Sequence, residues 1–405
     1  MTRFFTVAVG AIALHVVDDN FLQPNAGTSA GDHLVSGLVP LAVLALLAAL
    51  YPRVRAGAQA TIALMLGPLG VIAGAEAVRS LGATGLNGDD FTGLLAMTAG
   101  AVLIGLGVVT LWRSRRVDDR LVRRYARRAG LTVLGLLLTV QVVFPLMLSY
   151  GFTHVSRPLE PVRDLGVPHE RLTLTTSDGL KLAAMYVPSK NGAAVIAFPN
   201  RNGVQAHARM LARNGYGVLM LDRRGEGGSE GDPHSFGWTF DKDLEAAIEY
   251  LSRRPDVEPG RIGGYGKSVG GEMMLQAAAQ DDRIAAVVSE GAGARVQSEE
   301  MEDATTLDRW LYRLHYEVKY RSLEVFSNTS QPDDLTDLIP RIAPRPVFLI
   351  NAAHGEVDDK TPEYLAAARG PVRHWEVPEG RHTDGIEVMP EEYERRVVGF
   401  FDETL

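Results

Sequence analysis

The 405-residue sequence contains no cysteine, and this absence excludes several kinds of chemistry. A disulfide framework, a thiolate metal site and a cysteine nucleophile are all ruled out, although the chain still fits either side of a membrane. A strong charge of one sign is also missing, because the formal net charge is only -8. That balance gives no reason to expect nucleic acid as a partner.

Charged residues are scarce at the start of the chain, and this scarcity divides it in two. Residues 1–153 are dominated by Ala, Leu, Val and Gly, whereas residues 154–405 have the composition of a soluble domain rich in Asp, Glu and Arg. A helix of about 20 apolar residues crosses a hydrocarbon core. The clearest apolar runs are Leu34–Tyr51, Thr61–Val78, Phe91–Trp112 and Leu131–Gly151. Successive helices that are apolar on all sides are typical of a membrane protein.

A fifth apolar run, Phe4–Val17, is shorter and carries His15. Its alternative is a cleaved signal peptide, which needs a small-residue cleavage site close behind the run. The nearest such residues lie within Ala26–Ala30, beyond the polar Asp18-Asp19-Asn20. We therefore predict a transmembrane bundle of about five spans over residues 1–153.

Arginines mark alternate loops of this bundle and set its orientation. Arg53 and Arg55 follow the run Leu34–Tyr51. The loop before the run Leu131–Gly151 holds Arg113, Arg115, Arg116, Arg120, Arg123, Arg124, Arg127 and Arg128. The other loops are mainly acidic, with Asp18, Asp19, Asp32, Asp89 and Asp90. Because short cytoplasmic loops carry an excess of Lys and Arg, this pattern places everything after about Tyr150 outside the cytoplasm. The predicted location is the cell membrane, with the second half extracytoplasmic.

The second half alternates short β-rich runs with helix-length stretches from about Leu172 onward. This alternation predicts an α/β domain with a mostly parallel sheet and flanking helices. A hairpin across Ser177-Asp178-Gly179 is expected to open the domain. An insertion of helical character is expected before the strand Val347–Asn351.

The most informative motif is Gly266-Lys267-Ser268-Val269-Gly270, a Gly-x-Ser-x-Gly pentad. It follows a short glycine-rich run, Arg261–Tyr265, and precedes a helix-like one, Gly271–Ala279. Its glycines let the backbone turn sharply enough to present a serine hydroxyl above the sheet edge, at a helix N-terminus. The alternative is an ordinary glycine-rich turn between strand and helix. The flanking pattern favours a nucleophile elbow with Ser268 as the nucleophile.

A serine hydroxyl needs an adjacent base that a third group orients. In this arrangement the expected chain order is serine, acid, histidine. The histidines after Ser268 are His315 in the insertion, His354 before an acidic cluster, His374 within a predicted strand, and His382. His382 lies in a loop between the last predicted strand and the last predicted helix. A base at the sheet edge belongs in such a loop, so we predict that His382 is the base.

The acid has several candidates in one loop. Residues 351–362 contain Glu356, Asp358 and Asp359, any of which could instead cap the helix that begins near Pro362. Glu290, at the end of the preceding strand, is a further candidate. We rank Asp358 first and Glu356 second.

An oxyanion hole requires backbone N–H donors near the nucleophile. One is expected from Val269, the residue after the serine, and the other from the loop after the strand Ala193–Phe198. That loop begins with Pro199, which has no N–H. Asn200 or Arg201 is therefore the expected second donor.

These features together resemble the α/β-hydrolase superfamily of serine hydrolases, over roughly Arg171 to Leu405. Leu221–Gly231 resembles that family's Asp-x-Arg-Gly-x-Gly-x-Ser-x-Gly loop, and the elbow and the late His382-Thr383 follow in the family's order. The family commonly carries an acidic residue four positions before a proline, which Asp358 and Pro362 match. Two features depart from the family pattern. Phe198-Pro199-Asn200 replaces the usual His-Gly of the oxyanion loop, and the acid loop is longer than typical.

The resemblance also implies that residues about 292–338 form the cap. There Trp310, Leu311, Tyr312, Leu314 and Tyr316 would form either the core of the cap or an apolar surface for an acyl chain.

The sequence therefore predicts an α/β-hydrolase domain over residues 154–405, preceded by the transmembrane bundle. Its expected function is that of a membrane-anchored serine hydrolase, which cleaves an ester, thioester or amide without a metal or an organic cofactor. The expected partners are the lipid bilayer and a small-molecule or lipid-like acyl substrate. The alternatives are an inactive hydrolase-like receptor or scaffold, and a domain coupled to a transporter.

Overall fold

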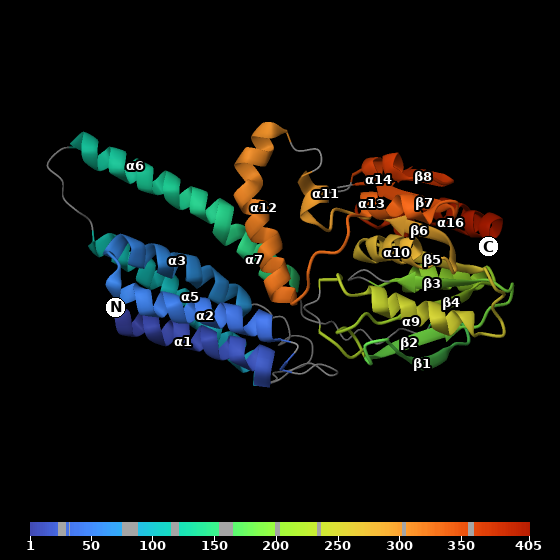
Figure 1. Ribbon diagram of the computed structural model, residues 1–405, viewed down its shortest axis with the longest axis horizontal. Coiled ribbons are helices and arrows are strands. Elements are labelled where there is room, and N and C mark those ends of the chain that lie inside the picture. The colour runs from blue at the N-terminus through green and yellow to red at the C-terminus, as the bar shows by residue number, and fades with distance from the viewer. Residues whose placement is uncertain are drawn as a thin grey trace. The chain divides into compact units, whose positions relative to one another are not determined.

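Figure 1 shows the computed structural model of the chain, in which the elements form two compact units. The structure describes residues 1–22, 30–31, 33–74, 88–114, 121–153, 165–198, 203–232, 236–301, 305–354 and 360–405. The first unit contains the helices up to Thr153 together with one later helix, α12. The second unit contains the sheet and the helices that cover it.

The first unit is built from helices, several of which are long and apolar. They are α1 (Thr2–Val17), α2 (Leu34–Leu50), α3 (Ala56–Ala73), α5 (Gly88–Arg113), α6 (Leu121–Leu138), α7 (Phe144–Thr153) and α12 (Thr306–Ser327). A π-helical turn, Asp18–Leu22, extends α1, another, Thr139–Val143, joins α6 to α7, and a 3-10 turn, Tyr51–Arg53, follows α2.

Five helical segments of the described chain are long and apolar enough to cross a membrane by length and composition. They are Thr2–Leu22, Leu34–Arg53, Ala56–Ala73, Phe91–Arg113 and Tyr125–Thr153. Each overlaps one of the predicted spans, so the sequence located these helices correctly. The end of the predicted run Thr61–Val78 lies outside the described residues.

Helices α3 and α5 approach each other through glycines. A Cβ at Gly100 would lie 2.5 Å from the carbonyl oxygen of Gly67, and a Cβ at Gly74 would lie 2.3 Å from that of Gly93. In membranes, small residues let helix backbones come close enough to pack by van der Waals contact. The glycines of α3 and α5 therefore form a specific packing surface between these two helices.

The second unit is an eight-stranded sheet in the order β1-β2-β4-β3-β5-β6-β7-β8. Its strands are β1 (Glu170–Thr175), β2 (Lys181–Val187), β3 (Ala194–Phe198), β4 (Gly217–Leu221), β5 (Ile262–Lys267), β6 (Ile284–Glu290), β7 (Val347–Ala352) and β8 (Val372–Val377). β2 pairs antiparallel with both β1 and β4, and all other neighbouring strands are parallel. The predicted hairpin is confirmed, with Gly179 at φ 89° in its turn.

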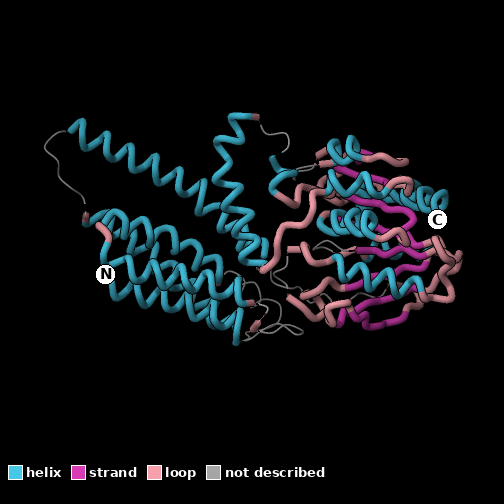
Figure 2. The backbone as a smooth tube through the Cα atoms, viewed as in Figure 1, coloured by secondary structure: helices cyan, strands magenta, loops and turns pink. Residues whose placement is uncertain are grey.

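Helices cover both faces of this sheet, as Figure 2 shows with strands in magenta and helices in cyan. The helices of this unit are α8 (Gln205–Arg213), α9 (Asp241–Ser252), α10 (Val269–Gln280), α11 (Gln297–Met301), α13 (Leu335–Leu338), α14 (Thr361–Ala367), α15 (Gly385–Val388) and α16 (Pro390–Thr404), with a 3-10 turn at Ile339–Ile342. One core cluster packs α9, α10 and α13 on the sheet, and the other packs α8 and α16. Every residue of β3 and β4 is buried, as in sheets covered on both faces. The predicted fold class is confirmed.

The predicted insertion, residues 292–338, contains α11, α12 and α13. Of these, α12 packs within the first unit, so the two units are not separated by a single cut near residue 153. Its side chains Trp310, Leu311, Tyr312 and Leu314 are exposed, so they do not form the core of a cap. The sequence pattern alone gave no sign that this helix packs with the apolar bundle.

Candidate active site

Ser268 occupies a strained turn between β5 and α10. Its backbone has φ 51° and ψ -125°, a combination that a residue with a side chain adopts only when its surroundings force it. The Ser268 N–H donates to the carbonyl oxygen of Glu290 at 2.7 Å. A Cβ at Gly266 would lie 2.1 Å from the carbonyl oxygen of Gly270, so only glycine fits at that position. The motif therefore forms the sharp turn that the sequence predicts.

His382 meets Ser268 from the loop between β8 and α15. Its Nε2 lies 3.0 Å from Ser268 Oγ, which is within reach for proton transfer. The next residue, Thr383, has φ 57°, so this loop is also strained. A Cβ at Gly291 would lie 3.2 Å from His382 Cε1, which places the ring closely against that backbone.

His374 and His315 have different partners. His374 Nε2 lies 2.7 Å from Asn351 Oδ1, and His315 Nδ1 lies 2.9 Å from the carbonyl oxygen of Val140. The structure brings the predicted base, His382, to Ser268.

Several predicted residues fall outside the described chain. The candidate acids Asp358 and Glu356 lie within residues 355–359, and the candidate donors Asn200 and Arg201 lie within residues 199–202. Val269 is described, and it is the first residue of α10. The first N–H groups of a helix have no acceptor within that helix, so the Val269 N–H is suited to an oxyanion beside Ser268.

Glu290 was a further candidate acid, and its carboxylate has three hydrogen-bond donors in the described structure. Oε2 accepts the hydroxyls of Tyr265 and Tyr393, both at 2.7 Å, and Oε1 accepts the Gly385 N–H at 3.2 Å. Burial and the neighbouring carboxylate of Glu290 raise the pKa of both tyrosines well above its ordinary value, so both hydroxyls remain protonated donors. Through its hydrogen bond with the Gly385 N–H, Glu290 therefore anchors the loop that contains His382.

A buried histidine and a buried lysine flank this carboxylate. His207 Nε2 lies 3.7 Å from Glu290 Oε2, but burial, helped by the charge of Lys267, holds the pKa of His207 well below its ordinary value. The imidazole is therefore neutral, and the contact is not an ion pair. Lys267 is only 4% exposed, and in β5 it pairs in register with Glu290 of β6. The side chains of Lys267 and Glu290 are thus both buried, at the ends of neighbouring strands.

Sequence reasoning missed the roles of Tyr265, Tyr393 and His207. Tyr265 was hidden in a buried strand and Tyr393 in the closing helix. They meet only when the sheet and α16 pack together, because 128 residues separate them in the chain. The available signal was a set of polar atoms in otherwise apolar segments, which must find partners when buried.

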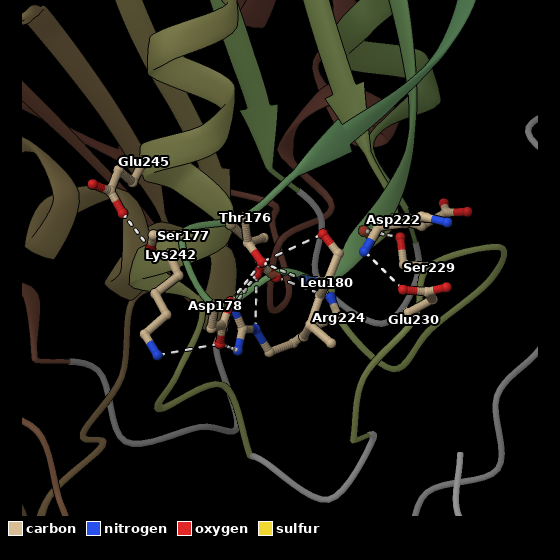
Figure 3. Close-up of polar contacts among 12 residues, drawn as sticks. Thr176, Ser177, Asp178, Leu180, Asp222, Arg224, Ser229, Glu230, Lys242 and Glu245 are labelled. Atoms are coloured by element: carbon tan, nitrogen blue, oxygen red, sulfur yellow. Dashed lines mark hydrogen bonds and ion pairs between the residues drawn. The ribbon is translucent and has the colours of Figure 1, made fainter. Parts of the chain in front are cut away.

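The glycine loop after β4, Asp222–Gly231, is held by polar contacts that Figure 3 shows. Arg224 donates to Asp243 Oδ1 at 2.7 Å and to Asp178 Oδ2 at 2.9 Å, and Ser229 Oγ donates to the Asp222 carbonyl at 2.7 Å. Burial raises the pKa of Asp243 to about 6, although Arg224 opposes this shift. Burial also tends to raise the pKa of Asp178. Hydrogen bonds from Arg224 and from a threonine hydroxyl outweigh this effect, so the pKa of Asp178 is below its usual range. The loop therefore ties the hairpin to α9.

A second buried polar cluster fixes the two ends of the insertion. The Glu299 carboxylate accepts the Arg295 N–H at 2.7 Å and the Leu335 N–H at 2.6 Å, so it joins the segment before α11 to α13. Glu272 accepts the Gly293 N–H at 3.3 Å. Burial raises the pKa of both carboxyls to about 7, although the Arg295 guanidinium opposes it. Among the described residues, no group of His, Asp and Glu side chains is arranged to hold a metal ion.

A family model matches within the second half of the chain. Residues 168–344 match the family model described as X-Pro dipeptidyl-peptidase (S15 family). The YfhR protein of Escherichia coli O157:H7 is 28% identical over 234 residues, which are 54% of this chain and 74% of that protein. The alpha/beta hydrolase domain-containing protein WAV2 of Arabidopsis thaliana is 33% identical over 144 residues, 33% of this chain and 46% of that protein. A Pyrococcus furiosus esterase structure matches with a TM-score of 0.48 and 22% identity, over 60% of this chain and 95% of that one.

Proposed function

We propose, from the premise that the second half of this chain belongs to the α/β-hydrolase superfamily, that the protein is a membrane-anchored serine hydrolase. It cleaves an ester, thioester or amide through an acyl-serine intermediate. The observation that carries this proposal is the 3.0 Å distance between Ser268 Oγ and His382 Nε2, in a turn that places Ser268 directly before the first residue of α10. The peptidase family match supports keeping amides among the candidate substrates.

The proposed reaction begins when Ser268 Oγ attacks the substrate carbonyl carbon while His382 Nε2 takes the hydroxyl proton. The carbonyl π electrons move to the oxygen, and the Val269 N–H stabilises that oxyanion together with an N–H of Asn200 or Arg201. The oxyanion then collapses, and the bond to the leaving group breaks as His382 donates the proton to it. Water next attacks the acyl-serine with His382 as the base, which releases the acid and restores Ser268.

Asp358 is the proposed acid that orients the imidazole, with Glu356 as the alternative. The described contacts of Glu290 go to Tyr265, Tyr393 and Gly385, which supports a positioning role for it. Five helices of sufficient length and apolar character support anchoring in a membrane. The arginine-rich loops support an extracytoplasmic position for the hydrolase domain.

The decisive experiment compares wild type, Ser268→Ala and the control Ser252→Ala on p-nitrophenyl esters of increasing acyl length. Ser252 is also a serine of this domain, but its hydroxyl bonds the Ile248 carbonyl within α9. We expect Ser268→Ala to lower kcat by more than about 10⁴-fold, because the nucleophile is gone. Ser252→Ala should match wild type.

Labelling with a fluorophosphonate probe separates the proposal from the scaffold alternative. An adduct on Ser268 in wild type, absent from the alanine variant, is the expected result. A folded wild-type protein that neither turns over esters nor forms this adduct would support an inactive receptor or scaffold. Turnover that survives in Ser268→Ala would show that another group is the nucleophile.

A further inference from the structure

Phe236 has a strained backbone and packs against the end of a candidate membrane span. Its φ is 52°, in the left-handed region that bulky residues rarely adopt. The ring centroids of Phe236 and Phe152 are 5.7 Å apart, with 32° between the ring planes. Phe152 lies near the end of the candidate span Tyr125–Thr153, and both aromatic residues belong to the first unit. A residue persists in such a conformation when its surroundings hold it there, and residues of this kind cluster at functional sites.

The next residue, Gly237, belongs to the second unit and lies against the residue that follows the nucleophile. A Cβ at Gly237 would lie 2.7 Å from Val269 Cγ2, so the Gly237 backbone packs closely against the Val269 side chain. Gly237 has φ 83°. Two consecutive residues, Phe236 and Gly237, therefore have left-handed conformations at the point where the chain passes from the first unit into the second.

The residues after Gly237 are fixed within the second unit. The Phe240 N–H donates to the Gly237 carbonyl at 3.4 Å, and the Phe240 ring lies 5.8 Å from the ring of Phe198 in β3. Trp238 is buried, and its indole N–H donates to the Arg295 carbonyl at 3.3 Å. Because these contacts hold the chain beyond Gly237, a displacement of Phe236 has to be accommodated at Gly237 itself.

We propose that Phe236 is a positioning residue, which couples the end of the candidate span to the oxyanion hole through Gly237 and Val269. Phe152 holds Phe236 in its left-handed conformation, and this fixes the Gly237 backbone against the Val269 side chain. The Val269 N–H is the proposed oxyanion donor, and a donor is effective only at hydrogen-bond distance from the developing charge. Loss of the aromatic contact lets Phe236 relax and removes this support from the first turn of α10. The inference rests on the proposed function.

Steady-state kinetics on p-nitrophenyl esters test the coupling in the full chain in detergent. Wild type is compared with Phe152→Ala, Phe236→Ala and the double variant. We expect each single variant to lower kcat by about 10- to 100-fold with little change in KM, because small displacements of catalytic groups have effects of this size. The double variant should lose no more than either single variant, because both substitutions remove the same contact. Losses that multiply in the double variant would overturn the proposal.

Phe326→Ala is the matched control, because it removes another aromatic contact at the same end of α7. The rings of Tyr150 and Phe326 are 5.5 Å apart in an edge-to-face arrangement. Neither residue is next in the chain to one that contacts Val269. Phe326→Ala should keep the kcat of wild type. An equal loss of kcat in this variant would overturn the proposal, because general loosening of the helical unit would then explain the effect.

Amide hydrogen exchange tests the same coupling without catalysis. The Gly271 and Glu272 N–H groups donate to the Ser268 carbonyl at 2.7 and 3.1 Å, in the first turn of α10. Opening of this turn exposes both amides to exchange. We expect their exchange to be severalfold faster in Phe152→Ala than in wild type, and unchanged in Phe326→Ala.

The two measurements separate failure of this inference from failure of the proposed function. Unchanged exchange or unchanged kcat in Phe152→Ala, in a wild-type background that turns over esters, would overturn the coupling alone. A wild-type protein with neither ester turnover nor a fluorophosphonate adduct would overturn the proposed function. In that case the exchange rates of Gly271 and Glu272 still decide whether the end of the span is coupled to this turn.

Discussion

At the scale of single residues, replacing the proposed acid Asp358 and replacing Glu290 have different expected effects. We expect Asp358→Asn to lower kcat on the order of 10⁴-fold, because an amide would favour the wrong imidazole tautomer, as measured for the Ser-His-Asp template. Glu290→Gln should lower kcat only about tenfold, because its carboxylate anchors Gly385 and two tyrosine hydroxyls rather than orienting the imidazole directly. Steady-state kinetics of both variants, with Glu379→Gln at an exposed position as the control, distinguish these roles. An equal loss in Glu290→Gln and Asp358→Asn would contradict this assignment.

Glu272 and Glu299 make the stability of the hydrolase domain dependent on pH. Burial raises the pKa of each carboxyl from 4.5 to about 7. Between these values the folded state binds more protons than the unfolded state, so the free energy of unfolding falls as pH rises. Their contribution is fully present below pH 4.5 and is lost as pH rises through about 7. Each shift corresponds to about 3 kcal/mol.

Chemical unfolding of the detergent-solubilised protein from about pH 4.5 to about pH 8 tests this dependence. The variants Glu272→Gln and Glu299→Gln should flatten the decline in stability, because an amide does not titrate. Glu379→Gln is the matched control, since Glu379 is exposed in the loop after β8. A wild-type stability that rises throughout this interval would show that other groups dominate.

At the scale of elements, the contact between α3 and α5 has no room for side chains at its glycines. In Gly100→Leu, the new Cβ would meet the backbone of Gly67 and Val71 at 2.5 and 2.6 Å, so the helices would have to separate. We expect a loss of at least about 1–3 kcal/mol, the usual range for overpacking. Gly105→Leu on the same helix is the control, because nothing lies within 4 Å of its Cβ. Thermal unfolding in detergent measures both, and equal melting temperatures would contradict this packing.

Elements with strong local signals were predictable from the sequence. The hairpin at Gly179, the elbow at Ser268 and the loop position of His382 follow from turn chemistry and from alternating apolar runs. The partner of α12 was not predictable, because an amphipathic pattern shows that a helix has two faces without showing what covers them. The cluster around Glu290 was equally hidden, since its members come from β5, β6 and α16 and meet only after packing.

At the scale of the whole molecule, the insertion between β6 and β7 links the two units. It leaves the sheet after Glu290, whose backbone oxygen accepts the Ser268 N–H, and its helix α12 packs on α7. The polypeptide therefore passes between the two units after Thr153, at Pro233–Phe236 and within this insertion. A soluble fragment that begins after residue 164 would leave α12 without the helix it packs against. Any study of activity should therefore use the full chain.

The orientation of the whole chain is predicted by its arginines and can be tested with single cysteines introduced into this cysteine-free chain. Arg395→Cys on the hydrolase domain should react with a membrane-impermeant maleimide in intact cells, because the domain is predicted to lie outside the cytoplasm. Arg113→Cys, at the end of the fourth candidate span, should react only after permeabilisation, because its loop is predicted to be cytoplasmic. The reverse labelling pattern would invert the proposed topology and would place the substrate inside the cell. Because the helical spans would be unchanged, such a result would leave the anchoring and the catalytic proposal intact.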